Sequence, residues 1–208
     1  AWCEKYGFLY ADKLIPREWL EEPPCPVRLA ALEKARIKTE EIDHLIIHCS
    51  ATKPSQDIGA TEIDRWHRAK GWLGNGYHYV IRRNGLIESQ ATGSRCRPLD
   101  QAGAHVGDCG PGWNKRSIGI CLVGGVDEQN RAEDNFTPEQ YASLKALVEY
   151  LVRSFPGIKV MGHRDLIKLT GAPPKDCPCF SVSDWLKSVG NKPGNYNSVE
   201  DNWPPVVT

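Results

Sequence analysis

Two histidines and one cysteine, far apart in the chain, have side chains that could together hold a metal ion. His48 ends an apolar, strand-like run, His163 lies in the segment GHRD (162–165), and Cys177 lies in the segment KDCP (175–178). Zinc prefers imidazole nitrogen and thiolate sulfur, and a catalytic zinc has three protein ligands and one open position. These three side chains therefore form a chemically complete set for a catalytic zinc site.

The residues alone leave other interpretations open. No compact CxxC or HExxH cluster is present, so His48 could also be a hydrogen-bonded core histidine and Cys177 a small buried apolar residue. Cys179 is a rival ligand, because it offers a second thiol two residues after Cys177. His44 precedes His48 by four residues, but in a strand this spacing separates two side chains by about 13 Å. We therefore expect His44 to be exposed and structural.

Several segments resemble one known family. The chain reads IIHCSATKPSQDIGATEIDRWHRAKGWLGNGYHYVIRR over 46–83, SIGICLVGG over 117–125 and NFTPEQ over 135–140. Together with KDCP, these segments resemble the type 2 N-acetylmuramoyl-L-alanine amidases, most closely the amidase-type lysozymes of T-odd coliphages. The peptidoglycan recognition proteins are more distant relatives. The resemblance extends over about residues 41–187.

The resemblance implies a function and assigns roles to residues. The implied reaction is zinc-dependent hydrolysis of the amide bond between the lactyl group of N-acetylmuramic acid and L-alanine in peptidoglycan. The two histidines and the cysteine named first are the implied Zn²⁺ ligands. Tyr77 is implied to orient water or assist proton transfer, Lys175 to donate to the developing oxyanion, and His105 to contact substrate.

The chain departs from the phage lysozymes in two places. The stretch from His163 to Lys175 is longer than in those proteins, and we expect it to form a bulging loop that shapes the substrate groove. A second insertion, DCGP (108–111), follows His105 closely and could alter its contact with substrate.

Two alternative functions follow from the same resemblance. A peptidoglycan recognition protein binds muropeptide without hydrolysing it, and such members typically lose the cysteine ligand, so the presence of Cys177 favours an enzyme. The closest phage lysozymes also inhibit the phage's single-subunit RNA polymerase. That surface involves the N-terminal region, and the forty-residue extension of this chain argues against transferring the property.

Composition narrows the classes of partner. Lys plus Arg and Asp plus Glu number 26 each, so no broad attraction to nucleic acid or anionic lipid is implied. No apolar run reaches the 18 to 20 residues that cross a bilayer, and the first residues do not resemble a signal peptide. We expect a monomer that binds peptidoglycan, has no membrane span and acts at the bacterial cell wall, whether secreted, periplasmic or released by a phage. The sequence does not identify an export route.

Hydrophobic patterns predict an α/β domain. β-Branched and aromatic runs indicate strands over 43–48, 77–82, 86–90, 118–123 and 159–162, and helical spacing indicates helices over 61–70, 138–154 and 183–188. Thr137 is the expected N-cap of the long helix, with Pro138 at its first position, and Asn84-Gly85 is an expected hairpin turn. The alternation predicts a central mixed β-sheet flanked by helices, as in amidases and peptidoglycan recognition proteins.

The ends of the chain differ in character from its centre. We expect residues 1–40 to be an N-terminal extension that packs on the core and includes a short amphipathic helix over 27–38. Residues 41–189 are expected to form the zinc amidase domain, and 190–208 an extended tail. Tryptophan side chains could pin both ends to the domain surface, namely those of Trp2, Trp19 and Trp203.

The eight cysteines allow more than one interpretation. Cys49 and Cys121 lie in strand-like runs and are expected to be buried thiols. Two disulfides would close short loops, each contributing about 2 to 4 kcal/mol. Their candidate pairs are Cys3 with Cys25 and Cys96 with Cys109, which leaves Cys179 unpaired. The alternative is that all these cysteines are reduced, and the sequence does not decide between the two.

Overall fold

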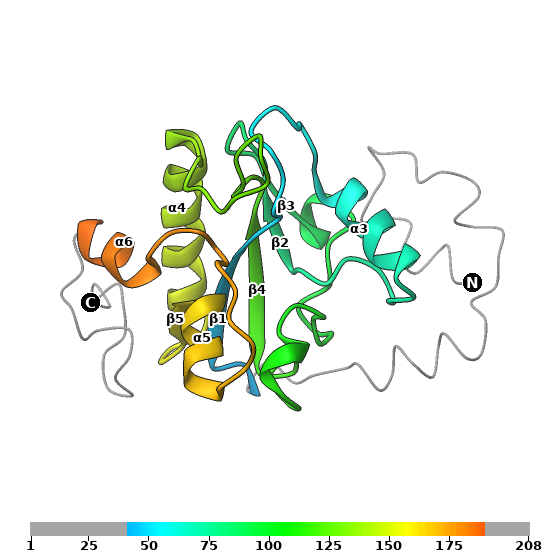
Figure 1. Cartoon of the computed structure of the whole chain (residues 1–208). Helices are drawn as coiled ribbons and strands as arrows, with labels where there is room; N and C mark the ends of the chain where they lie inside the picture. The colour runs from blue at the N-terminus through cyan, green and yellow to red at the C-terminus, as the bar shows by residue number, and fades with distance from the viewer. Residues whose placement is uncertain (1–40, 190–208) are drawn as a thin grey trace, which may run out of the picture. The chain divides into compact units, whose positions relative to one another are not determined.

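The computed structural model describes residues 41–189 of the chain, and its centre is one five-stranded sheet with the strand order β3-β2-β4-β1-β5. Helices cover both faces of this sheet (Figure 1). In chain order the elements are β1 (His44–Cys49), α3 (Ala60–Ala69), β2 (Tyr79–Ile81), β3 (Ile87–Ser89), η4 (Gln90–Thr92), η5 (Gly107–Cys109), β4 (Ser117–Leu122), α4 (Pro138–Ser154), β5 (Lys159–Gly162), α5 (His163–Thr170) and α6 (Val182–Ser188).

The sheet is mixed, as the sequence predicts. β1 pairs in parallel with both β4 and β5, and β2 pairs in parallel with β4, whereas β3 runs antiparallel to β2. The β2–β3 turn is the predicted hairpin, in which Gly85 has a φ of 82° and the Asn84 Oδ1 accepts a hydrogen bond from the backbone N–H of Leu86. A positive φ is readily adopted by glycine, because it has no Cβ. The predicted α/β class is therefore confirmed.

Both faces of the central strands are buried, which explains their nearly continuous apolar sequences. Alternate side chains of β1 face opposite ways: Leu45 and Ile47 belong to the core that includes α4 and α6. Ile46 instead packs with Leu166 and Ile167 of α5. His48 is two residues after Ile46, so its side chain lies on the α5 face of the sheet.

Helix α4 has the predicted bounds and the predicted cap. The Thr137 Oγ1 accepts a hydrogen bond from the backbone N–H of Gln140 at 3.1 Å, and the Gln140 Oε1 accepts one from the backbone N–H of Thr137 at 3.1 Å. This reciprocal pair is a capping box, which satisfies two backbone donors that a helix start otherwise leaves free.

The stretch from His163 to Lys175, predicted as a bulging loop, is in part a helix: α5 spans His163–Thr170, and a loop follows it. In the first turn of α5 the Asp165 Oδ2 accepts a hydrogen bond from the backbone N–H of Gly162 at 2.9 Å. Gly171 ends the helix with a φ of 71°, which is a common C-terminal conformation for glycine. Leu166 and Ile167 are buried, so this helix packs an apolar face against Ile46 of the sheet.

The described cysteines are all free thiols. Cys49 and Cys121 are buried, as predicted. Cys96 and Cys109 are unpaired and belong to different apolar clusters, so the predicted pairing between them is wrong.

Several predictions concern residues outside the described range of 41–189. They are the Cys3–Cys25 pair, the helix over 27–38, the extended tail, the contacts of Trp2, Trp19 and Trp203, and any N-terminal polymerase surface. The division into an extension, a catalytic domain and a tail stays a prediction. Within the described residues, no helix combines the length and apolar character needed to cross a membrane.

Gln140 offers a test of how α4 is attached to the sheet. Its fully buried amide Nε2 donates to the carbonyl oxygens of Ile81 and Val123 at 3.1 and 2.9 Å. Gln140→Leu removes both donors and the cap acceptor, so we expect the free energy of unfolding to fall by about 2 kcal/mol. Urea unfolding measures the change, and Gln129→Leu on an exposed loop is the matched control, expected to change stability by less than about 0.5 kcal/mol. Equal effects of the two substitutions would contradict this account.

Candidate active site

The predicted metal ligands come together at the end of β1. The parallel register aligns Ile47 of β1 with Gly162 of β5, so the next residues along each segment are His48 and His163. One nitrogen from each histidine and the sulfur of Cys177 all lie within 4.8 Å of one another. His48 thus forms one compact donor group with two residues that lie more than a hundred positions later in the sequence.

Backbone contacts hold Cys177 in this group. The backbone N–H of Cys49 donates to the Cys177 Sγ at 3.4 Å, and the backbone N–H of Arg164 donates to the carbonyl oxygen of Cys177 at 2.7 Å. The end of β1 and the start of α5 therefore both position the loop that carries the cysteine.

The hydrogen bonds of the two histidines leave one nitrogen of each ring available. The His48 Nε2 lies 2.9 Å from the His105 Nδ1, while the His48 Nδ1 lies 3.6 Å from the Cys177 Sγ. The His163 Nε2 donates to the Asp108 Oδ1 at 3.1 Å. With both Nε2 atoms engaged, the two Nδ1 atoms and the Cys177 sulfur make the donor set. Two imidazole nitrogens and one sulfur fit Zn²⁺ with a position left open.

Both histidines are in the form that a metal requires. Burial lowers the pKa of His48 well below its ordinary value, and nearby positive charge, including that of Lys175, acts in the same direction. Burial also lowers the pKa of His163, although Asp108 opposes this shift. Both rings are therefore neutral at pH 7, and only a neutral imidazole has a lone pair to give to a metal.

Cys179, the rival ligand, points elsewhere. Its Sγ donates to the carbonyl oxygen of Asp176 at 2.6 Å and lies 3.6 Å from the Cys49 Sγ. It is absent from the donor groups found among the described residues. The geometry thus favours Cys177 over Cys179.

Tyr77 borders the donor group. The centre of its ring is 5.1 Å from that of His48, and its backbone N–H donates to the Asn75 Oδ1 at 3.0 Å. A Cβ on Gly76 would lie 2.3 Å from the carbonyl oxygen of Ala104, so this tight approach of two loops requires glycine. Burial raises the pKa of Tyr77 well above its ordinary value, which keeps its hydroxyl protonated at neutral pH.

Lys175 reaches the same region from the loop that carries Cys177. Its ammonium group donates to the Asp108 Oδ2 at 2.6 Å, and its side chain is 52% exposed. Asp108 therefore contacts both His163 and Lys175. Sequence reasoning noted the insertion that contains Asp108 but gave this residue no role. The only signal in the sequence was that the carboxylate of Asp108 lies three residues after His105, a predicted site residue.

Two other histidines, His105 and His44, are buried in the structure. His105 is buried and contacts His48, and its Nε2 lies 3.5 Å from the Ser117 Oγ. The predicted contact of His105 with substrate stays a prediction. His44 was expected to be exposed, but it is buried against the Trp113 ring. The expectation was wrong because the second face of β1 is covered, so even a polar strand position is enclosed.

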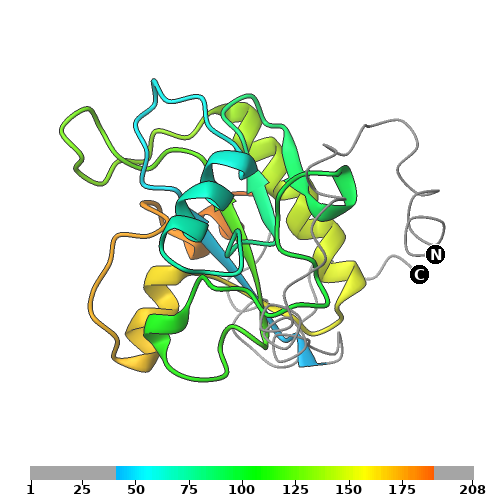
Figure 2. The same ribbon diagram turned by 90° about the vertical axis from the view of Figure 1, so that its right-hand side faces the viewer.

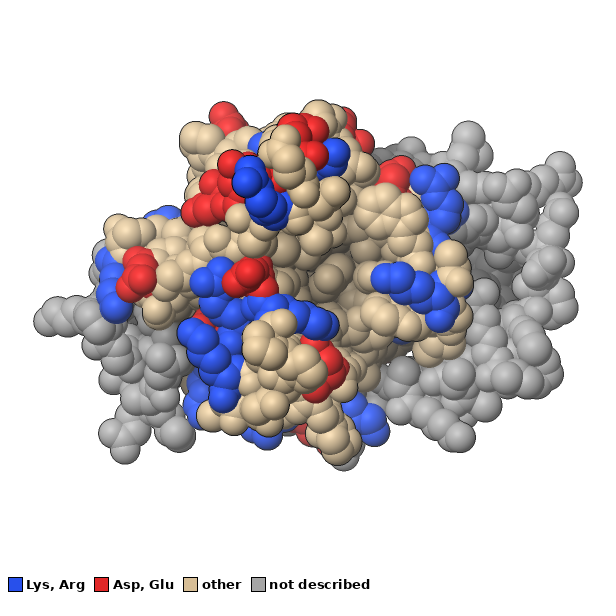
Figure 3. Space-filling view, viewed as in Figure 1, with Lys and Arg blue, Asp and Glu red and all other residues tan. Residues whose placement is uncertain are grey.

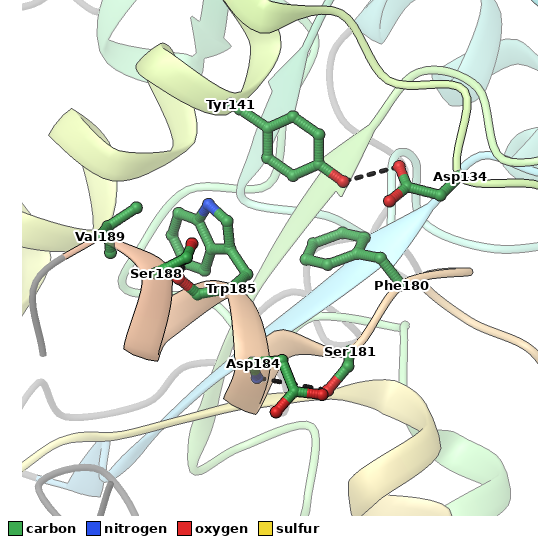
Figure 4. Close-up of a pocket in the computed structure, with 8 residues that line it drawn as sticks. All are labelled: Asp134, Tyr141, Phe180, Ser181, Asp184, Trp185, Ser188 and Val189. Carbon is green, nitrogen blue, oxygen red and sulfur yellow. Dashed lines mark hydrogen bonds between the residues drawn. The ribbon is translucent and has the colours of Figure 1, made fainter. Parts of the chain in front are cut away.

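A separate groove lies on the other side of the sheet, between α4 and α6. It has a volume of about 510 Å³, and aromatic side chains of Tyr141, Phe180 and Trp185 line it (Figure 4). None of the predicted site residues lines this groove. The surface in Figure 3 shows Lys and Arg interspersed with Asp and Glu around an uncharged centre, in line with the equal numbers of acidic and basic residues in the chain.

Comparisons with known proteins identify the family. A model of the N-acetylmuramoyl-L-alanine amidases matches residues 38–180, and a model of phage endonuclease I matches residues 1–40. The chain is 39% identical over 151 residues to the endolysin of Enterobacteria phage K11, covering 73% of this chain and 89% of that protein. It is 39% identical over 146 residues to the endolysin of Escherichia phage T7, covering 70% and 86%.

A solved structure shows the same fold. It is the N-acetylmuramoyl-L-alanine amidase LysC from Clostridium intestinale URNW, with a TM-score of 0.55 and 27% identity over 75% of this chain and 91% of that one. The family model spans more than half of this chain, and the match to each endolysin covers most of that endolysin. The chain therefore belongs to the N-acetylmuramoyl-L-alanine amidase family.

Proposed function

We propose that this protein is a zinc-dependent amidase of bacterial cell walls. It hydrolyses the amide bond between the lactyl group of N-acetylmuramic acid and the L-alanine of the stem peptide in peptidoglycan. The observation that carries the proposal is the donor group of His48, His163 and Cys177, whose ligand atoms lie within 4.8 Å of one another. Zinc in this group would act as a Lewis acid, polarising the scissile carbonyl and lowering the pKa of water to about 7.

The remaining chemistry belongs to side chains beside the donor group. Tyr77 keeps its proton at neutral pH because burial raises its pKa, so its hydroxyl can orient the attacking water by hydrogen bonding. Lys175 carries an ammonium group that can donate to the carbonyl oxygen as negative charge develops there. Such a donor stabilises the transition state more than the ground state, which is what accelerates the reaction.

A recognition protein without hydrolytic activity is the main competing function. Cys177 argues against it, because a binding module has no need of a thiol whose Sγ lies 3.6 Å from the His48 Nδ1. The presence of the full donor group supports the enzyme.

Metal content and hydrolysis should be measured together on the purified protein. We expect one zinc per chain and release of free L-alanine amino termini from purified peptidoglycan. A chelator should abolish this release, and added zinc should restore it. A zinc-free protein that binds peptidoglycan without cutting it would instead support the recognition function.

Cys177→Ser should abolish hydrolysis and weaken zinc binding, because it removes one of three protein ligands. The loss of affinity should exceed the roughly 10 to 100-fold effect typical of removing a group that only supports a ligand. Cys179→Ser is the matched control and should leave zinc affinity and turnover nearly unchanged. The reverse result would exchange the roles of the two cysteines. Competition with a chromophoric chelator measures the affinity.

Lys175→Ala should leave zinc content unchanged while lowering kcat by about 100 to 1,000-fold, the usual effect of losing one oxyanion donor. Lys168→Ala, on the exposed side of α5, is the control for removing a nearby positive charge and should retain wild-type turnover. Loss of zinc from the Lys175 variant would show that this lysine has a structural role and not a catalytic one.

A further inference from the structure

Asp108 lies in η5 (Gly107–Cys109), within the segment DCGP (108–111) that closely follows His105. Its carboxylate uses both oxygens: Oδ1 accepts from the His163 Nε2 at 3.1 Å, and Oδ2 accepts from the Lys175 Nζ at 2.6 Å. One side chain thus joins a proposed metal ligand to the proposed oxyanion donor.

The position of Asp108 is determined by the packing of its neighbours. The adjacent Cys109 is buried in a cluster with Leu166 and Ile167 of α5. On the other side, the Asn114 Oδ1 accepts hydrogen bonds from the backbone N–H groups of His105 and Val106 at 2.9 and 3.1 Å. Figures 1 and 2 show the green segment that contains η5 beside the yellow α5 in both views.

The contact with His163 has a direct consequence for metal binding. A carboxylate that accepts from Nε2 favours the tautomer with its proton on that atom, which leaves the Nδ1 lone pair free. It also orients the ring and makes the remaining nitrogen a better donor. His48 has a different partner, the nitrogen of His105. Among the described residues, Asp108 is thus the only one whose carboxylate forms a hydrogen bond or ion pair with either histidine ligand.

The contact with Lys175 restrains a long and half-exposed side chain. An exposed ion pair contributes little to stability, but it limits where the ammonium group can lie. The carboxylate contacts both partners at once, so it can restrain each of them.

We propose that Asp108 is a positioning residue, which holds His163 in its metal-binding orientation and keeps Lys175 beside the scissile bond. This inference rests on the proposed function. It predicts two separable effects, one on zinc affinity through His163 and one on turnover through Lys175.

A second metal site is the competing explanation, since ligand atoms of Asp108, Cys109 and His163 also lie within 4.8 Å of one another. Two features oppose it. The Lys175 ammonium group already occupies one carboxylate oxygen and repels a cation. Burial also raises the pKa of Cys109, which favours the protonated thiol over the thiolate that binds metals.

Asp108→Ala tests the effect on His163. We expect zinc affinity to fall by about 10 to 100-fold, measured by competition with a chromophoric chelator. The zinc affinity of Asp108→Asn should lie between those of wild type and Asp108→Ala. The amide oxygen of asparagine can still accept a hydrogen bond from the His163 Nε2, but it has no charge. Asp184→Ala is the matched control: it removes an exposed aspartate that pairs with Lys187 at 3.0 Å, and it should leave zinc affinity unchanged. Thermal unfolding of the metal-free variants verifies that each is folded.

A double-mutant comparison at saturating zinc tests the effect on Lys175. Asp108→Ala should lower kcat in the wild-type background and cause little further loss in a Lys175→Ala background, because the partner it restrains is gone. Zinc affinity within twofold of wild type, or losses of kcat that simply multiply, would overturn the proposal. Two zinc ions in wild type and one in Asp108→Ala would overturn it in favour of the second metal site. Wild-type protein that binds no zinc would defeat the proposed function as well, which distinguishes the two failures.

Discussion

The parallel pairing of β1 with β5 is the constraint on which the candidate site depends. Ile47 lies opposite Gly162 in this register, so the next residues along the two segments are His48, which is still within β1, and His163, the first residue of α5. A shift of one residue would turn His48 to the opposite face of the sheet, because side chains alternate along a strand. Buried residues on both faces of β1 oppose such a shift, so the hydrophobic core fixes the spacing of the donor atoms.

Burial has a second consequence, which is chemical. It lowers the pKa of both His48 and His163 and raises that of Tyr77. The site therefore presents neutral imidazoles and a protonated phenol at neutral pH without any change in conformation. Lys175 differs, because its side chain is half exposed and keeps its charge accessible to substrate. The same enclosure that stabilises the fold thus sets the protonation state of the groups that would bind metal and orient water.

The parts of the fold that sequence predicted well are those with strong local signals. Thr137 and Pro138 mark the start of α4, and Asn84-Gly85 marks the hairpin. The set of site residues came from resemblance and not from spacing, since His48 and Cys177 are 129 positions apart. Local patterns could not show that His44 is enclosed, because its burial depends on what covers the second face of β1. The first forty residues lay outside the resemblance, and they match a different family model.

The error over α5 and the omission of Asp108 have a common origin. Asp108 and α5 both belong to segments that were expected from the sequence to depart from the phage lysozymes, so the resemblance offered no guide to either. In the structure these two segments pack on each other: Cys109 of η5 is buried with Leu166 and Ile167 of α5. Neither segment would bury this apolar surface alone, and their contact places the Asp108 carboxylate 3.1 Å from the first residue of α5. The η5 segment and α5 therefore pack as one structural unit, which contacts the candidate site at the imidazole of His163.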